Sequence, residues 1–230
     1  MLVIILRNID LQYLLTTVNR TCKRLCDVIR TSSVLREVFD FDCRIQLKNE
    51  DLKKVLSHSK RFEQFMLFSG ALDDCRVCDI DYNFIKYFDK AKSLFWMTLV
   101  DAPISTLGFL VNVPNLQILN LTGCKNLVDA DFLAVASCKN LDQLYLSFTK
   151  VSPETLINIT TGKRLTALDV SGVKLKLQHC HDILRYSWET LLFFHLSLEE
   201  DIAQNQFELH IRDVYRGCSF NLFRPWRNLV

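Results

Sequence analysis

Glycine and proline are scarce in this sequence, with 6 and 4 copies among 230 residues. This scarcity argues against a collagen-like chain, a glycine-rich linker and a turn-dense all-β sandwich. An excess of one charge is also missing, because 28 basic residues stand against 26 acidic ones. A net charge of +2 gives no general reason to expect nucleic acid or a membrane as a partner.

Long hydrophobic runs are missing as well. The apolar run at the start, from Met1 to Leu6, ends at Arg7 and is far shorter than the ~18 residues of a transmembrane helix. It is also too short for the apolar part of a secretory signal. The nine cysteines are an odd number spread along the chain. We therefore expect reduced thiols and a cytoplasmic and/or nuclear location.

A repeated apolar pattern is the strongest positive feature. The pattern L-x-x-L-x-L, with other apolar residues allowed, begins at Leu94, Leu116, Leu141, Leu165 and Leu191. The copies are 22 to 26 residues apart, a period typical of leucine-rich repeats. A weaker sixth copy begins at Phe62, and the segment from Leu35 to Phe41 is interpreted as a degenerate first strand.

Apolar residues at helical spacing between these strands indicate a helix in each repeat. Leu127–Cys138 has this spacing, and Val151–Ile159 adds Ser152 as an N-cap and Pro153 at the first helical position. A strand–helix unit cannot bury its apolar face alone, so stacked units form one continuous core. We therefore predict an α/β leucine-rich-repeat solenoid with parallel strands on the concave face and helices on the convex face.

Two cysteines fit a particular version of this repeat. Cys124 follows the letters L-N-L-T-G, and Cys138 precedes K-N-L. In these places the chain resembles the cysteine-containing leucine-rich repeats, which implies that both cysteines are buried structural residues. Ala102, Thr149 and Val173 stand at the position of Cys124 in other copies. Such variation is typical of a packing position and not of a metal site.

Residues 5–38 have a different character, with apolar residues spaced for helices. The segment from Val18 to Leu25 reads V-N-R-T-C-K-R-L, with Ile9-Asp-Leu11 before it and S-V-L-R after it. This stretch resembles the second half of an F-box. An F-box followed by leucine-rich repeats is the arrangement of a family of ubiquitin-ligase substrate receptors. The family's opening L-P-x-E helix is absent here, and Leu25 stands where the family has tryptophan.

The resemblance implies a non-catalytic substrate-recognition subunit of an SCF-type, cullin-based ubiquitin ligase. Residues 1–38 would form an F-box-like helical segment that docks the Skp adaptor. Residues 39–204 would form the solenoid, of about six repeats, and residues 205–230 a C-terminal tail or cap. The implied adaptor-binding residues are Leu6, Ile9, Leu11, Leu14, Leu15 and Val18.

Two alternatives remain open at this point. In the first, residues 5–38 only cap the solenoid, as terminal repeats require, and the protein is an interaction scaffold with no ubiquitin-ligase link. In the second, the protein is an intracellular inhibitor or sensor that binds one enzyme tightly through the same concave face.

Strand geometry predicts which residues face a partner. In L-x-x-L-x-L the leucines point into the core and the alternating residues point to the concave face. The candidate target-binding residues are Trp96, Ile118, Gln143, Tyr145, Asp169, Phe193 and His195. We expect Trp96, Tyr145 and Phe193 to line one groove about four strands wide and to dominate binding of a target protein, because aromatic residues are frequent hot spots. In the alternative, aromatic residues of the C-terminal segment cover this face: Phe207, Phe220, Phe223 and Trp226.

Catalytic and cofactor motifs are not found in the sequence: G-x-S-x-G, H-E-x-x-H and a glycine-rich phosphate loop are all missing. The C-x-x-C at Cys75–Cys78 and the cluster at His179–His181 lie ~100 residues apart, several repeats along a solenoid, so we expect no shared metal site. Asp129 and Asp131 fall at a predicted helix start, where carboxylates are favoured. We predict no catalytic residue, no metal, no cofactor and no enzymatic activity.

Overall fold

The computed structural model describes residues 38–41, 64–68, 92–198 and 219–222. The residues predicted to bind the adaptor, all between positions 6 and 18, lie outside the described residues. So do the Cys75–Cys78 motif, Phe207, Phe223 and Trp226.

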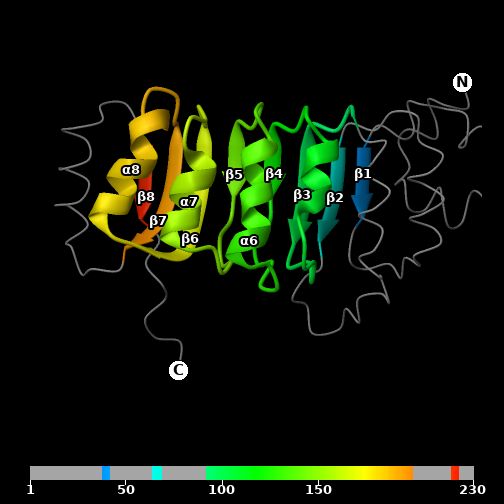
Figure 1. Cartoon of the computed structure of the whole chain (residues 1–230), viewed down its shortest axis with the longest axis horizontal. Helices are drawn as coiled ribbons and strands as arrows, with labels where there is room; N and C mark the ends of the chain where they lie inside the picture. Colours follow the sequence, from blue (N-terminus) through cyan, green and yellow to red (C-terminus); the bar gives the residue numbers. More distant parts are fainter. Residues whose placement is uncertain (1–37, 42–63, 69–91, 199–218, 223–230) are drawn as a thin grey trace, which may run out of the picture.

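The described strands form one parallel sheet whose strand order follows the chain (Figure 1). They are β1 (Val38–Phe41), β2 (Gln64–Phe68), β3 (Trp96–Val100), β4 (Ile118–Asn120), β5 (Gln143–Tyr145), β6 (Ala167–Leu175), β7 (Phe193–Leu198) and β8 (Ser219–Leu222). Each strand pairs in parallel with the next. The prediction of a parallel sheet is confirmed, including strands at the two weakest copies of the pattern.

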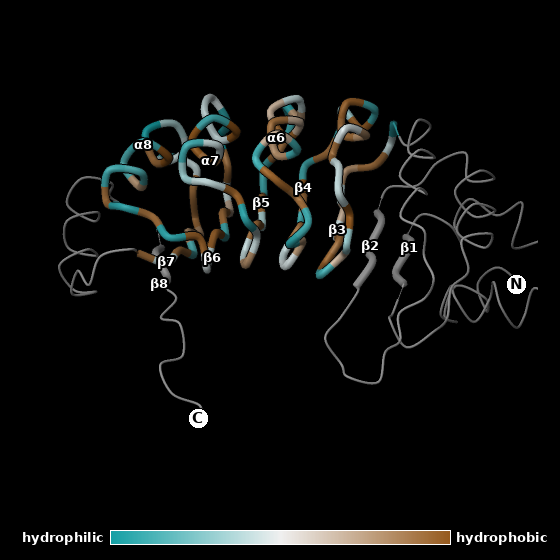
Figure 2. Tube along the Cα trace, turned by 60° about the horizontal axis from the view of Figure 1, so that its bottom comes forward, coloured by the Kyte–Doolittle hydropathy of each residue, from teal (hydrophilic) through white to brown (hydrophobic). Residues whose placement is uncertain are grey.

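The helices of the described part lie on one face of this sheet. They are the α-helices α6 (Asp129–Phe132), α7 (Pro153–Thr160) and α8 (Leu177–Ser187) and the 3-10 helices η4 (Gly108–Asn112) and η5 (Leu133–Ser137). Figure 2 shows the sheet curving into an arch with these helices on its outer side. The inner, concave side of the arch is formed by the strands, as predicted.

The core is built from the leucines of the repeat. Leu119, Leu144, Leu168 and Phe194 occupy one register row across β4 to β7, and none is more than 1% exposed. The leucines that begin and end each pattern are buried too: Leu116, Leu121, Leu141, Leu146, Leu165, Leu191 and Leu196. Apolar side chains stacked at a constant spacing let each repeat cover the face of the next one.

The half-repeat between β4 and β5 differs from the predicted helix, because α6 is short and continues as the 3-10 helix η5. Phe132, Val135 and Cys138 are all fully buried and lie three residues apart. A 3-10 helix has 3.0 residues per turn, so it places residues with this spacing on one side. The tighter winding is therefore the one that buries all three side chains.

The predicted helix start at Ser152 is confirmed. Its hydroxyl oxygen accepts a hydrogen bond of 3.2 Å from a backbone N–H three residues later, and Pro153 is the first residue of α7. The capping interpretation of the two aspartates is confirmed as well. Asp131 accepts from the backbone N–H of Val128 at 3.0 Å, and Asp129 accepts from that of Ser152, in the next repeat, at 2.8 Å.

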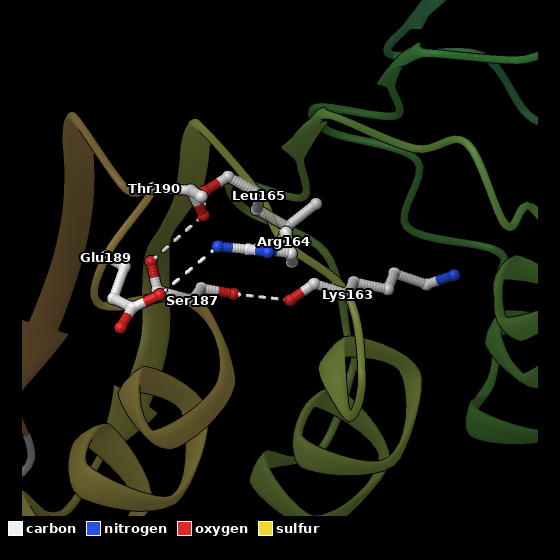
Figure 3. A network of polar contacts seen from close by, with 6 residues as sticks. All are labelled: Lys163, Arg164, Leu165, Ser187, Glu189 and Thr190. Carbon is white, nitrogen blue, oxygen red and sulfur yellow. Dashed lines mark hydrogen bonds and ion pairs between the residues drawn. The ribbon is translucent and has the colours of Figure 1, made fainter.

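Hydroxyl side chains join neighbouring repeats at the turns that precede the strands (Figure 3). Ser187 donates to the backbone carbonyl oxygen of Lys163 at 2.9 Å, and Thr190 donates to that of Leu165 at 2.8 Å. These bonds pair carbonyl groups that the short turns leave without a backbone partner.

Lys163 is a buried cation with a structural explanation. Its Nζ donates to the carbonyl oxygen of Cys138 at 2.7 Å and lies 3.4 Å from that of Ala136, at the end of η5. Helix C-terminal carbonyls lack partners within the helix and favour a positive charge. Burial lowers the pKa of Lys163. Its ammonium group nevertheless has two backbone carbonyl oxygens as hydrogen-bond acceptors.

A further strand lies in the segment 205–230, which is predicted above as a tail or cap. Residues 219–222 form β8, which continues the sheet in register with β7. Phe220 pairs with Phe194 in this register. It thus belongs to a strand paired with β7. The described sheet therefore contains one strand, β8, that the leucine pattern does not predict.

Candidate functional site

Two rows of side chains cross the concave face at register positions shared by β3 to β7. The first, which we call the aromatic row, consists of Trp96, Ile118, Gln143, Ala167 and Phe193. The second, the polar row, consists of Thr98, Asn120, Tyr145, Asp169 and His195. The rows lie two residues apart on each strand, about 7 Å, and four strand spacings make each about 19 Å long.

All seven predicted target-binding residues lie in these rows. Trp96, Ile118, Gln143 and Phe193 belong to the aromatic row, whereas the polar row contains Tyr145, Asp169 and His195. The three aromatic residues therefore share one face but not one row, since Tyr145 is offset along its strand by two residues from Trp96 and Phe193. Trp96 on β3 and Phe193 on β7 lie at the two ends of the face, and Tyr145 on β5 lies in its middle.

The two partly buried aromatics are held along their own strands. The indole N–H of Trp96 donates to the hydroxyl of Thr98 at 3.0 Å, and the phenol of Tyr145 donates to the side-chain carbonyl of Gln143 at 3.0 Å. Phe193, with 54% of its surface exposed, is the most accessible residue of the two rows. Side chains fixed before binding lose less entropy when a partner arrives.

Negative charge gathers around Tyr145 in the middle of the face. Burial raises the pKa of Tyr145, and the carboxylates of Asp169 and Asp142 raise it further. One oxygen of Asp169 accepts from the backbone N–H of Ser171 at 3.0 Å, and its other oxygen lies 3.8 Å from Nδ1 of His195. Asp169 is therefore fixed in place by the backbone of the turn that follows it.

A left-handed backbone recurs at one position of the repeat, two residues after the last apolar residue of the pattern. Asp101, Gly123, Phe148 and Gly172 have φ angles of 52°, 73°, 56° and 85°. Glycine adopts this conformation freely, but it costs a bulky residue roughly 1–3 kcal/mol. Phe148 is nonetheless 49% exposed, and its ring covers Gly172, where an added Cβ would come within 2.8 Å of a ring carbon.

Phe148 is a further candidate residue for this face and was not predicted. It follows Tyr145 by three residues, at the rim of the concave face where β5 ends. Backbone strain at an exposed side chain is an outlier from which a functional role can be inferred as a hypothesis. The signal was present in the sequence, since alignment of the repeat copies places Phe148 at the position of Gly123 and Gly172.

We expect Phe148→Gly to change the free energy of unfolding by less than ~1 kcal/mol, because relief of backbone strain offsets the lost ring contact and the entropy of glycine in the unfolded chain. Gly172→Ala should lower it by ~1–3 kcal/mol, since alanine meets both a left-handed φ and the Phe148 ring. Urea denaturation of both variants beside the wild type is the measurement. A loss above ~3 kcal/mol for Phe148→Gly, as in a core deletion, would show that the ring is structural.

The described cysteines are buried thiols. Cys124 Sγ lies 2.9 Å from the carbonyl oxygen of Leu99, to which the thiol donates. Burial raises the pKa of Cys124 to about 12, and it does the same for Cys180. The implied structural burial of Cys124 and Cys138 is confirmed.

The cluster at His179–His181, considered above as a source of metal ligands, lies on α8, and two of its residues take part in the structure of that helix. Nδ1 of His179 accepts from the backbone N–H of Lys176 at 3.2 Å, at the start of the helix, and Cys180 is buried. Among the residues that the structure describes, no three His, Cys, Asp or Glu side chains gather closely enough to hold a metal ion. Within the same part of the chain, no helix combines the length and apolar character needed to cross a bilayer.

Similarity to known proteins is found among solved structures. No protein-family model matches the sequence, and no curated protein matches it. Among solved structures, the chain is similar to an internalin C2 from Listeria monocytogenes, with 14% identity, a TM-score of 0.45 and 66% of each chain covered. The assignment to an α/β leucine-rich-repeat solenoid rests on the register and burial described above.

Proposed function

We propose that this protein is a non-catalytic recognition module that holds a target protein on its concave face. The observation that carries the proposal is the pair of in-register rows. Their aromatic and polar side chains are prearranged on the strands, whereas the core is already complete on the other side of the sheet. Curved repeat faces of this kind suit extended protein partners.

A non-catalytic role is supported by the hydrogen bonds of two neighbouring aspartates. Asp129 and Asp131 both accept backbone hydrogen bonds at helix starts, so their carboxylates stabilise the fold. The buried thiols of Cys124 and Cys180 likewise have raised pKa values, which makes them poor nucleophiles. Free thiols also suit the proposed cytoplasmic or nuclear location, where disulfides are rare.

We further propose that the target is delivered to an SCF-type ubiquitin ligase. This finer assignment is supported by the F-box resemblance of residues 5–38 and by their position ahead of the repeats. Residues 1–38 would dock the Skp adaptor, and the cullin-based complex would supply the catalysis.

Pull-down with purified Skp adaptor tests this assignment. Charge on the apolar face of the helices should abolish binding, so we expect the full chain to retain the adaptor and Leu14→Asp or Leu15→Asp to lose at least ten-fold in affinity. Leu133→Asp is the matched control, because Leu133 is exposed on the convex side. Circular dichroism should show the same fold in all variants.

Two outcomes would contradict the adaptor assignment. If the wild-type chain does not retain the adaptor, or if Leu14→Asp and Leu15→Asp bind at wild-type strength, residues 5–38 are a cap. The protein is then an interaction scaffold with no ubiquitin-ligase link, and target recognition by the concave face stands.

A further inference from the structure

We propose that the concave face recognises a basic segment of its partner, with a lysine or arginine side chain seated among Asp142, Tyr145 and Asp169. We call these three residues the acidic centre. The inference rests on the proposed function, since it names the chemistry of the target that the face would hold.

The charge of the face is opposite to that of the chain. The chain carries a net charge of +2, yet neither row contains a lysine or an arginine. The residues that directly precede the aromatic row are Phe95, Gln117, Asp142, Thr166 and Leu192, and these also include no basic residue. The acidic groups of the two rows and of the residues before them are thus Asp142 and Asp169, whose carboxylates favour a cationic partner. The imidazole of His195 lies 3.8 Å from Asp169 in the same row.

The geometry of the acidic centre suits one cation. Tyr145 and Asp169 are direct register neighbours on β5 and β6, where paired strands lie about 4.8 Å apart. Asp142 precedes β5, and its charge acts on the phenol of Tyr145 together with that of Asp169. The phenol proton is directed to Gln143. The phenol oxygen, the tyrosine ring and the carboxylate of Asp142 therefore remain as groups that attract a guanidinium or an ammonium. Asp169 adds its negative charge beside them, although its two oxygens already face the N–H of Ser171 and the ring of His195.

Apolar residues near the acidic centre indicate which side chains the rest of the partner's segment needs. The aromatic row lies about 7 Å from the polar row, with Trp96 and Phe193 at its two ends. A partner therefore needs apolar side chains on either side of its cation. The face is about 19 Å long, which corresponds to about six residues of extended chain. A short segment with a central basic residue and apolar neighbours fits these dimensions.

Two labelled peptides of about eight residues, enough to span the face, provide the test. One carries a central arginine and lysine between leucine and phenylalanine residues, and the other has glutamates in place of the two basic residues. Fluorescence anisotropy with the full chain should show the basic peptide binding at least ten-fold more tightly than the acidic one. The preference should decrease as salt is raised.

Variants that remove a charge without changing the shape of the side chain show which residues cause the preference for the basic peptide. Asp142→Asn and Asp169→Asn should each weaken the basic peptide roughly three- to ten-fold, and the double variant should abolish the preference between peptides. Asparagine at 169 can still accept the hydrogen bond from Ser171, so melting temperatures should be unchanged. Glu154→Gln, on the exposed first turn of α7, is the matched control and should leave both affinities unchanged.

Three results would overturn the inference. The first is equal or tighter binding of the acidic peptide, and the second is an unchanged preference in the double variant. The third is no binding of either peptide at about 1 mM, the weak limit of useful affinity. None of these results contradicts target recognition itself, which is measured separately by loss of target binding in the aromatic variants described below.

Discussion

Replacing Leu144 with alanine is expected to lower the free energy of unfolding by ~2–5 kcal/mol. Leu144 is fully buried and lies in β5, the middle strand of β3 to β7. Its register neighbours are Leu119 in β4 and Leu168 in β6. A cavity at this position removes contacts with both neighbouring repeats at once, and a close-packed interior relaxes only in part to fill it.

Urea denaturation measures this effect directly. Leu133→Ala is the matched control, because the same side chain is removed where half of its surface is exposed. It should shift stability by no more than ~0.5 kcal/mol, as surface substitutions usually do. A loss below ~1 kcal/mol for Leu144→Ala would contradict the continuous core that defines the solenoid.

The second large effect concerns binding. Truncating a central aromatic hot spot typically costs ~2–4 kcal/mol of binding energy, or about 30- to 1,000-fold in affinity. We expect losses of this size for target binding in Trp96→Ala, Tyr145→Ala and Phe193→Ala. Phe193→Ala should leave stability nearly unchanged, because its side chain is largely exposed. Trp96→Ala and Tyr145→Ala should cost about 1 kcal/mol of stability each, through their hydrogen bonds to Thr98 and Gln143.

The competing outcome reverses this pattern. If C-terminal aromatic residues covered the face, Trp96→Ala and Tyr145→Ala would lower stability by more than the ~1 kcal/mol expected from their hydrogen bonds and leave target binding unchanged. The structure places Phe220 in β8, in register with Phe194 of β7. Measuring melting temperature and affinity on the same variants decides between the two.

Much of the fold was predictable because its signals are local. Alternation of two along a strand assigned Leu119, Leu144 and Leu168 to the core before any neighbour was known. The cap at Ser152 depends only on the residues that follow it. Even the 3-10 helix η5 was readable in principle, since Phe132, Val135 and Cys138 are spaced by three.

The candidate site was predictable only in part. The sequence places Trp96, Tyr145 and Phe193 on one face, because that follows from alternation within each strand. It does not reveal that Tyr145 lies in a different row, since rows depend on how neighbouring strands are registered. It also does not reveal β8, whose residues lack the leucine pattern but pair with the exposed edge of β7.

What the sequence by itself determined is the repeating unit: its period, its inward leucines and the face on which the remaining residues lie. These follow from steric rules that act within a few residues. Only the tertiary structure decided the acidic surroundings of Tyr145, because Asp142 and Asp169 belong to different repeats and act through space. It alone also revealed the left-handed Phe148 over Gly172. That conformation is imposed by the turn shared with neighbouring repeats, against the preference of the residue itself.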